Sequence, residues 1–264
     1  MKLGFIGTGN MASAIMGGII KNQIIPANDI IGADVMEAGR ERVKEQFGIQ
    51  VTADNHEVVR NSDVVILSVK PQFYAEVIAE IKDDVREDQI IITIAPGKTL
   101  AWLKEQFGKN VKIVRTMPNT PALVGEGMTA ACPNEYMTKE EIAYVLTLLE
   151  SFGRVEIIPE RLMDTVVSVS GSSPAYVFMF IEAMADAAVS GGMPRAQAYQ
   201  FAAQAVLGSA KMVLETGKHP GELKDMVCSP AGTTIEAVRV LEEKGFRSAV
   251  IEAMKTCEEI SKNM

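Results

Sequence analysis

The sequence has few of the residues that metalloenzymes and hydrolases use. It contains three cysteines and two histidines among 264 residues, and the patterns HExxH, CxxC and GxSxG are missing. A zinc site and a serine hydrolase of the nucleophile-elbow type are therefore not expected, and we predict no bound metal. An enzyme with so few reactive side chains must take its reactivity from an organic cofactor.

Basic charge is also scarce. The chain carries 26 Lys plus Arg against 34 Asp plus Glu, a formal net charge of −8, which argues against nucleic acid and anionic membranes as partners. The cysteines are scattered and odd in number, so they indicate a reducing compartment. The first residues, Met1–Gly7, become glycine-rich too soon for a secretory signal peptide. We therefore expect a cytoplasmic protein.

The first part of the chain alternates short apolar runs with amphipathic stretches. Nearly continuous apolar segments such as Asp63–Val69 and Ile90–Ile94 are typical of parallel strands that are buried on both faces. The other predicted strands are Lys2–Ile6, Asp29–Ala33, Val111–Thr116, Met128–Ala131 and an edge strand at Val155–Ile158, and the predicted helices are Met11–Lys21, Glu37–Phe47, Gln72–Ile81, Leu100–Phe107 and Lys139–Phe152. This alternation predicts an α/β fold over residues 1–160, a doubly wound and mainly parallel sheet.

After Pro159 the pattern becomes helical throughout, so residues 161–264 are expected to form an all-helical domain. The predicted helices are Leu162–Val169, Pro174–Val189, Pro194–Thr216, Glu222–Val227, Thr233–Glu243 and Phe246–Met264. The helix Pro174–Val189 is apolar nearly all round, but it is too short and too acidic for a membrane span. Its faces must be buried, either in a subunit interface, which we prefer, or as a central helix inside the domain.

The segment Gly7–Ala12 has the G-x-G-x-x-A pattern of a dinucleotide-binding turn. It follows the first strand directly and opens the first helix, which is the context that the pattern requires. In such a turn Gly7 allows the tight bend and Gly9 lets the backbone approach a pyrophosphate, which the helix N-terminus faces. The segment therefore predicts a dinucleotide cofactor.

An acidic residue, Asp34, ends the second predicted strand. A carboxylate at this position can accept hydrogen bonds from both ribose hydroxyls and repel a 2′-phosphate, which favours NADH over NADPH. Asp34 can instead cap the helix that follows, and Arg40 and Arg42 are near enough in sequence to reach a phosphate. The cofactor is therefore NADPH or NADH, with Asp34 leaning toward NADH.

Two further loops follow strands of the predicted sheet. Ser68–Pro71 and Ala95–Gly97 both come directly after buried strands. Ligands of open α/β sheets bind beyond the carboxyl ends of the strands, so we expect both loops to line the cofactor crevice. Met117–Pro121 follows another strand and fits either a rigid pocket wall or an ordinary connection.

A loop of small residues, Cys228–Glu236, leads into a helix of the second domain. Thr233 and Glu236 have the spacing of a capping box, which would need no function. The loop also offers backbone N–H groups and three hydroxyls at a helix N-terminus, an arrangement suited to a carboxylate. The pattern alone leaves both interpretations open.

Taken together, these motifs resemble the pyrroline-5-carboxylate reductase family. The resemblance covers nearly the whole chain, and its motifs are Gly7–Ala12, Val69–Pro71, Met117–Pro121, Ser170–Tyr176, His219–Pro220 with Leu223–Asp225, and, most specifically, Val227–Thr234. The sequence departs from the family pattern at Ala231, where many members carry glycine, and at Ala33–Asp34, where NADPH-preferring members often have small polar residues.

The resemblance implies a Rossmann domain followed by a helical dimerisation domain. It implies reduction of 1-pyrroline-5-carboxylate to L-proline by NADPH or NADH, which is the final step of proline biosynthesis. It also implies a homodimer, often assembled further into a homodecamer, in which the partner subunit completes the substrate site.

The resemblance assigns Ser229, Gly232 and Thr233 to the substrate carboxylate, and Thr234 to the ring nitrogen as the catalytic contact. It also places Asn55 at the adenosine ribose or its phosphate. The cofactor-binding residues expected from the loops and the resemblance together are Ile6, Gly7, Thr8, Gly9, Asn10, Met11, Asp34, Asn55, Ser68, Val69, Lys70, Pro71 and Ala95.

Two other functions fit part of the sequence. A non-catalytic dinucleotide sensor would bind the cofactor without turnover, but it leaves the loop Ser229–Thr234 unexplained. A 3-hydroxyacid dehydrogenase of similar architecture needs a positioned Lys or His base. Lys211, Lys218 and Lys224 of the helical domain have instead the pattern of surface residues.

Overall fold

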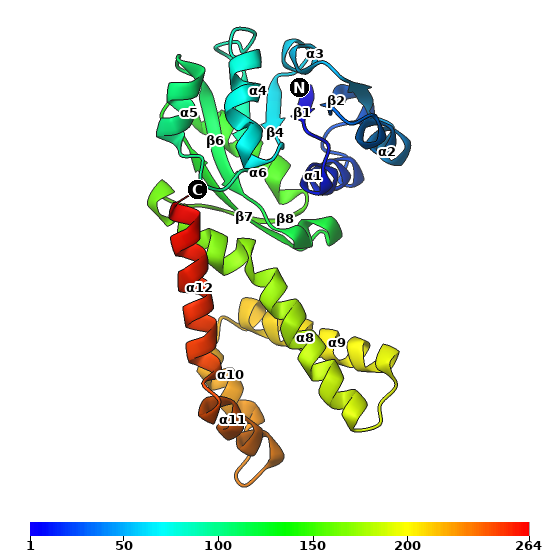
Figure 1. The fold of residues 1–264 in the computed structure, drawn as a ribbon, viewed down its shortest axis with the longest axis vertical. Coiled ribbons are helices and arrows are strands. Elements are labelled where there is room, and N and C mark those ends of the chain that lie inside the picture. Colours follow the sequence, from blue (N-terminus) through cyan, green and yellow to red (C-terminus); the bar gives the residue numbers. More distant parts are fainter. Residues whose placement is uncertain (264) are drawn as a thin grey trace. The chain divides into compact units, whose positions relative to one another are not determined.

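The computed structural model describes residues 1–263 (Figure 1). They divide into two compact units: Met1–Ser172 together with the chain from Cys257 onward, and Ser173–Thr256. The first unit holds the sheet, and the second consists of helices. This agrees with the predicted order of an α/β region followed by a helical region.

The first unit is built on one eight-stranded sheet, in which the strand order is β3-β2-β1-β4-β5-β6-β7-β8. All neighbouring strands are parallel except β6 and β7. The strand order reverses between β1 and β4, which is where doubly wound sheets bind their ligands. The strands are β1 Leu3–Ile6, β2 Ile30–Ala33, β3 Gln50–Thr52, β4 Val64–Leu67, β5 Ile90–Thr93, β6 Lys112–Met117, β7 Gly127–Pro133 and β8 Gly153–Ile157.

The sheet is covered on both faces because successive side chains of a strand point in opposite directions. In β4, Val64 and Ile66 pack into one apolar cluster, whereas Val65 and Leu67 pack into another. Helices α1, α2 and α6 close the first cluster, and α3, α4 and α5 close the second (Figure 1). These helices are α1 Asn10–Lys21, α2 Glu37–Phe47, α3 Asn55–Arg60, α4 Tyr74–Ile81, α5 Leu100–Phe107 and α6 Lys139–Glu150.

Strand β3 and helix α3 were not predicted from the sequence. The strand β3 has three residues, of which Gln50 is exposed, and α3 has six, so neither is long enough to show a period. The edge strand predicted at Val155–Ile158 is present as β8. The predicted helix Leu162–Val169 is shorter, since α7 spans Met163–Val166 and a π-helix follows at Val167–Gly171.

The second unit contains the predicted helices at nearly the predicted bounds: α8 Ser173–Ser190, α9 Arg195–Thr216, α10 Pro220–Val227, α11 Thr233–Glu243 and the first part of α12 Phe246–Lys262. The predicted end of the last helix, at Met264, lies outside the described residues. In α8, Ala185 alone among the described residues is buried. Phe178 and Met179 are 63% and 68% exposed, so α8 is not the central helix of its own domain.

One helical stretch of the described chain, Glu160–Ser190, is long and apolar enough to cross a membrane when judged by length and composition alone. A single stretch of this kind is weak evidence, because helices of protein interiors pass the same test. An apolar helix that its own chain leaves uncovered is equally suited to a subunit interface.

Candidate functional site

The fingerprint turn begins where β1 ends. Gly7 adopts φ +94°, and a Cβ on it would lie 2.8 Å from the Ser68 carbonyl carbon, so a side chain here would be strained and would clash. The Ser68 hydroxyl donates to the Gly7 carbonyl at 2.7 Å, and the Gly7 N–H donates to the Ala33 carbonyl at 2.8 Å. The turn therefore joins the carboxyl ends of β1, β2 and β4.

The helix α1 presents an open N-terminus beyond this turn. Its N-cap is Gly9, and within residues 1–263 no side chain caps the helix. A Cβ built on Gly9 would have no described atom within 4 Å, and both Gly9 and Asn10 are exposed. The unsatisfied N–H groups and the positive end of the helix dipole suit a pyrophosphate. The residues present thus fit the predicted dinucleotide.

The carboxylate of Asp34 is held by the fingerprint turn itself. Its Oδ2 accepts hydrogen bonds from both the backbone N–H and the hydroxyl of Thr8, each at 2.8 Å. Its Oδ1 accepts from the Met36 N–H at 2.9 Å, at the start of α2. Thr8 and Asp34 are 26 positions apart, so no local pattern predicts their direct contact.

Arg40 and Arg42, considered above as phosphate ligands, are engaged with backbone carbonyls. Arg40 donates from Nη1 to the Asp34 carbonyl at 2.7 Å, and Arg42 donates from Nη2 to the Thr8 carbonyl. Arg40 thus contacts the end of β2, which carries Asp34, and Arg42 contacts the fingerprint turn.

The loop Ser68–Pro71 lies beside the fingerprint turn, as its place at the end of β4 predicts. Ser68 N–H donates to the Ile6 carbonyl at 2.8 Å, continuing the β1–β4 ladder past the last strand residue. Val69 is half-buried, whereas the side chain of Lys70 is exposed. Ala95, after β5, is buried.

In the second unit, the predicted substrate residues share one turn before α11. The Gly232 N–H donates to the Ser229 carbonyl at 3.0 Å, and Gly232 is the N-cap of the helix. A Cβ on Gly232 would lie 2.3 Å from the Ser229 hydroxyl oxygen and 3.1 Å from the Ser229 carbonyl oxygen, so a side chain here would displace the Ser229 hydroxyl. Thr233 is exposed and Thr234 half-buried.

The capping-box interpretation of Thr233 and Glu236 is wrong. Thr233 is the first residue of α11 rather than its N-cap, and Glu236 instead accepts from Arg239 at 3.0 Å. Among the described residues no side chain caps α11, so its N-terminal N–H groups are open, as they are in α1. The hydroxyls of the turn are therefore not required for helix capping.

Comparison with known proteins gives the family. A family model described as pyrroline-5-carboxylate reductase dimerisation matches residues 160–264, and one described as NADP oxidoreductase, coenzyme F420-dependent, matches residues 2–97. The chain is 55% identical over 267 residues to the pyrroline-5-carboxylate reductase of Escherichia coli, covering 100% of this chain and 98% of that protein. It belongs to the pyrroline-5-carboxylate reductase family.

Other pyrroline-5-carboxylate reductases agree in sequence and structure. The enzyme of Methanosarcina acetivorans is 44% identical, with 100% of this chain and 97% of that protein covered. The Coxiella burnetii structure matches with a TM-score of 0.91 at 35% identity, covering 99% of this chain and 97% of that one. The Plasmodium falciparum structure, which has NADP bound, matches with a TM-score of 0.92 at 33% identity, covering 100% and 97%.

The departure from the pyrroline-5-carboxylate reductase pattern at Ala231 has a visible consequence. Ala231 adopts φ +58°, a left-handed conformation that glycine reaches without strain and alanine does not. The turn before α11 is therefore held in a conformation that is strained for alanine.

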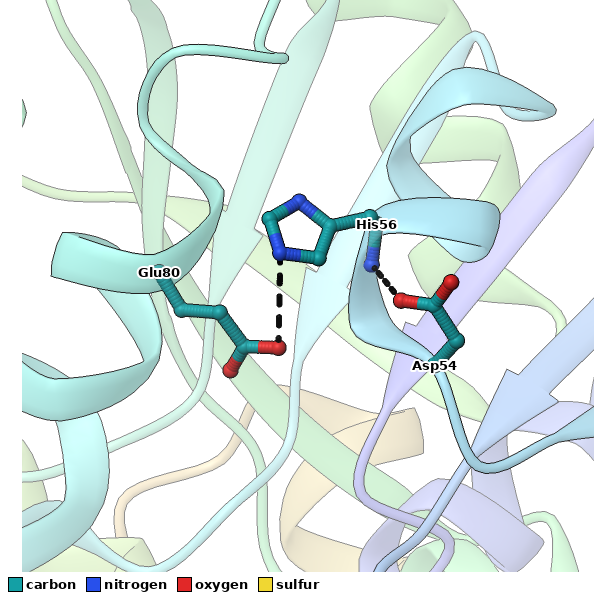
Figure 2. A group of neighbouring side chains, drawn as sticks. All are labelled: Asp54, His56 and Glu80. Atoms are coloured by element: carbon teal, nitrogen blue, oxygen red, sulfur yellow. Dashed lines mark hydrogen bonds and ion pairs between the residues drawn. The ribbon is translucent and has the colours of Figure 1, made fainter.

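Asn55, which the resemblance places at the adenosine, begins α3 and is engaged with α4. Its Nδ2 donates to Glu80 Oε2 at 2.9 Å. Figure 2 shows the neighbouring side chains: Asp54 accepts from the His56 N–H at 2.9 Å, and His56 Nε2 lies 3.9 Å from Glu80 Oε1. Donor atoms of these three side chains lie within 4.8 Å of one another, close enough for one metal ion, and the absence of a metal stays a prediction.

His56 also pairs with Asp84 on its other ring nitrogen, Nδ1. The hydrogen bond to Asp84 raises the pKa of His56 above its ordinary value. The same bond, together with the bond from Arg60 Nε at 2.9 Å, lowers the pKa of Asp84. The contacts of His56 and Arg60 with Asp84 thus hold α3 against the segment that follows α4.

Proposed function

We propose that this chain reduces 1-pyrroline-5-carboxylate to L-proline with a hydride from NADH or NADPH, the last step of proline biosynthesis. The observation that carries the proposal is the 55% identity to the Escherichia coli pyrroline-5-carboxylate reductase over the full chain. Two uncapped helix N-termini support it, because each suits one of the two anions that this reaction brings together.

The first unit is proposed to bind the cofactor. The open backbone of Gly9, Asn10 and Met11 would hold the pyrophosphate, while Ile6, Gly7 and Thr8 shape the turn. The other residues proposed to contact the cofactor are Asp34, Asn55, Ser68, Val69, Lys70, Pro71 and Ala95. When bound, the reduced nicotinamide supplies the hydride, and the chain itself needs no redox-active side chain.

The turn before α11 is proposed to bind the substrate. The carboxylate would accept hydrogen bonds from the Ser229 hydroxyl and from the backbone of Gly232 and Thr233 at the open helix N-terminus. The Thr234 hydroxyl, one residue further into the helix, would contact the ring nitrogen. A cyclic imine accepts a hydride more readily when protonated, so the hydroxyl would orient the iminium ion. Thr234 is thus the proposed catalytic residue.

The proposed cofactor preference is NADH. Asp34 is fixed at the end of β2 by Thr8 and Met36, where its negative charge would oppose a 2′-phosphate. Arg40 and Arg42 are directed to backbone carbonyls, so both would have to reorient to hold a phosphate. The NADP found in the Plasmodium falciparum structure belongs to that protein.

We further propose that residues 1–160 bind the dinucleotide and that residues 161–264 bind the substrate and form a homodimer. The exposed apolar side chains of α8 and the dimerisation model that matches residues 160–264 support the second part. Assembly of dimers into a homodecamer and a cytoplasmic location are predictions from the family and the composition.

The activity is tested by assaying the purified protein with pyrroline-5-carboxylate and each reduced cofactor, following oxidation of the nicotinamide and formation of proline. We expect turnover with both cofactors and a higher kcat/KM with NADH. Binding of a cofactor without turnover would support a sensor instead, and turnover of a 3-hydroxyacid would support a dehydrogenase.

A further inference from the structure

Tyr74, the first residue of α4, is completely buried against the sheet. Its hydroxyl donates to the Leu67 carbonyl at 2.5 Å and accepts from the Ile94 N–H at 3.2 Å. Leu67 is the last residue of β4, and Ile94 directly follows β5. One phenol oxygen therefore joins the carboxyl ends of two adjacent parallel strands.

The bridge lies where the β4–β5 ladder ends. The last paired residues of the two strands are Leu67 and Thr93. Beyond them β4 runs into Ser68–Pro71 and β5 into Ala95–Gly97. A buried backbone carbonyl or N–H needs a partner, and at the point of divergence the strands no longer supply one to each other. The Tyr74 hydroxyl takes that place for both atoms.

Ser68, the residue after Leu67, links the end of β4 to the fingerprint turn. The Ser68 hydroxyl donates to the carbonyls of Gly7 and Ile6, at 2.7 Å and 3.2 Å. Tyr74 is thus linked through the end of β4 to the turn after β1, and through the Ile94 N–H to the loop after β5. These are the carboxyl ends of strands beside the point where the strand order reverses.

The surroundings keep the phenol in one state. Tyr74 packs in the apolar cluster that contains Val65, Leu67 and Ile91. This burial raises the pKa of the Tyr74 hydroxyl well above its ordinary value. The group therefore stays protonated at neutral pH and can donate to Leu67.

We propose that Tyr74 is a positioning residue for the cofactor: its hydroxyl fixes the loops Ser68–Pro71 and Ala95–Gly97 relative to each other. This inference rests on the proposed function, in which both loops line the cofactor. Tyr74 itself would not touch the dinucleotide. Its hydroxyl would set the spacing of the two loops that do. A loop pair held in advance binds more tightly than one that must be ordered by the ligand.

The test compares Tyr74→Phe with a matched variant at the other end of the sheet. Gln89 is also fully buried, directly before β5, and its Nε2 donates to the carbonyls of Val59 and Ser62 at 2.8 Å and 2.7 Å. Gln89→Leu removes comparable buried hydrogen bonds far from the carboxyl ends of the strands. The Kd of each reduced cofactor, the kinetic constants and the Tm are measured for wild type and both variants.

We expect Tyr74→Phe to weaken cofactor binding about tenfold, since a buried carbonyl and N–H lose their shared partner. The KM for the cofactor should rise with it, while kcat at saturating cofactor stays near the wild-type value. Gln89→Leu should lower the Tm at least as much and leave the Kd unchanged.

Equal cofactor Kd values for Tyr74→Phe and wild type would overturn the inference. So would an equal loss of affinity in Gln89→Leu, because that result would reflect general destabilisation. A wild-type protein that binds neither NADH nor NADPH would overturn the proposed function itself. That result is distinct from one in which the wild type binds the cofactor and Tyr74→Phe binds it equally well.

Discussion

The two units bury their apolar residues in different ways. In the first unit Phe5, Ile66 and Phe152 are at most 1% exposed, because helices from the same unit close both faces of the sheet. In the second unit Phe178 and Phe201 are 63% and 67% exposed. The first unit therefore completes its own core, whereas the apolar helices of the second need a surface that the single chain does not provide.

The units also share one feature, a helix with an open N-terminus. Each has a helix whose N-cap is glycine and whose first N–H groups no described side chain caps, α1 with Gly9 and α11 with Gly232. In contrast, α6 begins with a complete capping box between Thr138 and Glu141. Helices α2, α4 and α9 also begin without a side-chain cap, so what α1 and α11 share is an open N-terminus behind a glycine N-cap, at the two places where an anion is proposed to bind.

The largest expected effect tests the contrast in burial. Phe178→Glu places a charge on the exposed face of α8, and an unpaired buried charge in an interface costs about 3–5 kcal/mol. We expect the dimer to dissociate, with a dissociation constant raised roughly 10²- to 10⁴-fold, measured by sedimentation. Val35→Glu is the control, since Val35 is 88% exposed on the first unit and its change should leave the oligomeric state intact. A dimeric Phe178→Glu protein would contradict the interface assignment.

The next effect tests the turn before α11, which is proposed to bind the substrate. Thr234→Ala should lose a hydrogen bond to a charged substrate, about 1.5–3 kcal/mol, or roughly ten- to a hundred-fold in kcat/KM. The Tm and the cofactor Kd should barely change, because Thr234 does not cap α11. Ser229→Ala is the matched variant and should act chiefly on substrate KM, since a carboxylate contact is present in ground and transition states alike. Normal kcat/KM in Thr234→Ala, or lost cofactor affinity, would mean that the turn has another role.

A smaller effect tests the cofactor turn. Asp34→Ser should raise the kcat/KM for NADPH relative to NADH by about tenfold, because a carboxylate near a phosphate is repelled by about 1 kcal/mol or more. The change also frees the N–H of Thr8, so Asp34→Asn serves as the matched variant: it keeps an acceptor oxygen and removes the charge. A shift in Asp34→Ser that is missing in Asp34→Asn would point to the shape of the turn rather than its charge.

The smallest effect concerns the pair of His56 and Asp84, which holds α3 to the segment that follows α4. The raised pKa of His56 means that its contribution to stability is complete below its ordinary pKa of 6.5 and is lost as the pH rises through its pKa in the folded protein. The lowered pKa of Asp84 means that its contribution is complete above 3.8 and is lost as the pH falls through its folded pKa. The Tm should therefore fall slightly as the pH rises from 6 toward 8.

His56→Asn should flatten this part of the Tm profile, and Asp84→Asn should flatten it less, because Asp54 and Glu80 still raise the pKa of His56 in that variant. A slope that persists in both variants would show that other groups cause it. Asp54, Glu80 and Arg60 surround the pair and remain in both variants, so their own titration is common to all three proteins.

The order and type of most helices and strands could be predicted from local patterns in the chain. Strands such as β4 and β5 could be predicted because a run of β-branched residues buried on both faces has few other solutions. The turn before α11, proposed to bind the substrate, could be singled out because its motif lies within one short segment. Whether Thr233 and Glu236 form a capping box could not be decided there, since spacing alone does not say which residue begins a helix.

The tertiary structure is needed to see which distant groups meet. Thr8 and Asp34, or Tyr74 and Ile94, are 26 and 20 positions apart, and no local pattern joins them. Parallel strands run in the same direction, so their carboxyl ends, and the residues that follow them, lie together at one edge of the sheet. The tertiary structure is also needed to see that the apolar faces of α8 stay uncovered in one chain, since a run of apolar residues predicts burial without saying by what.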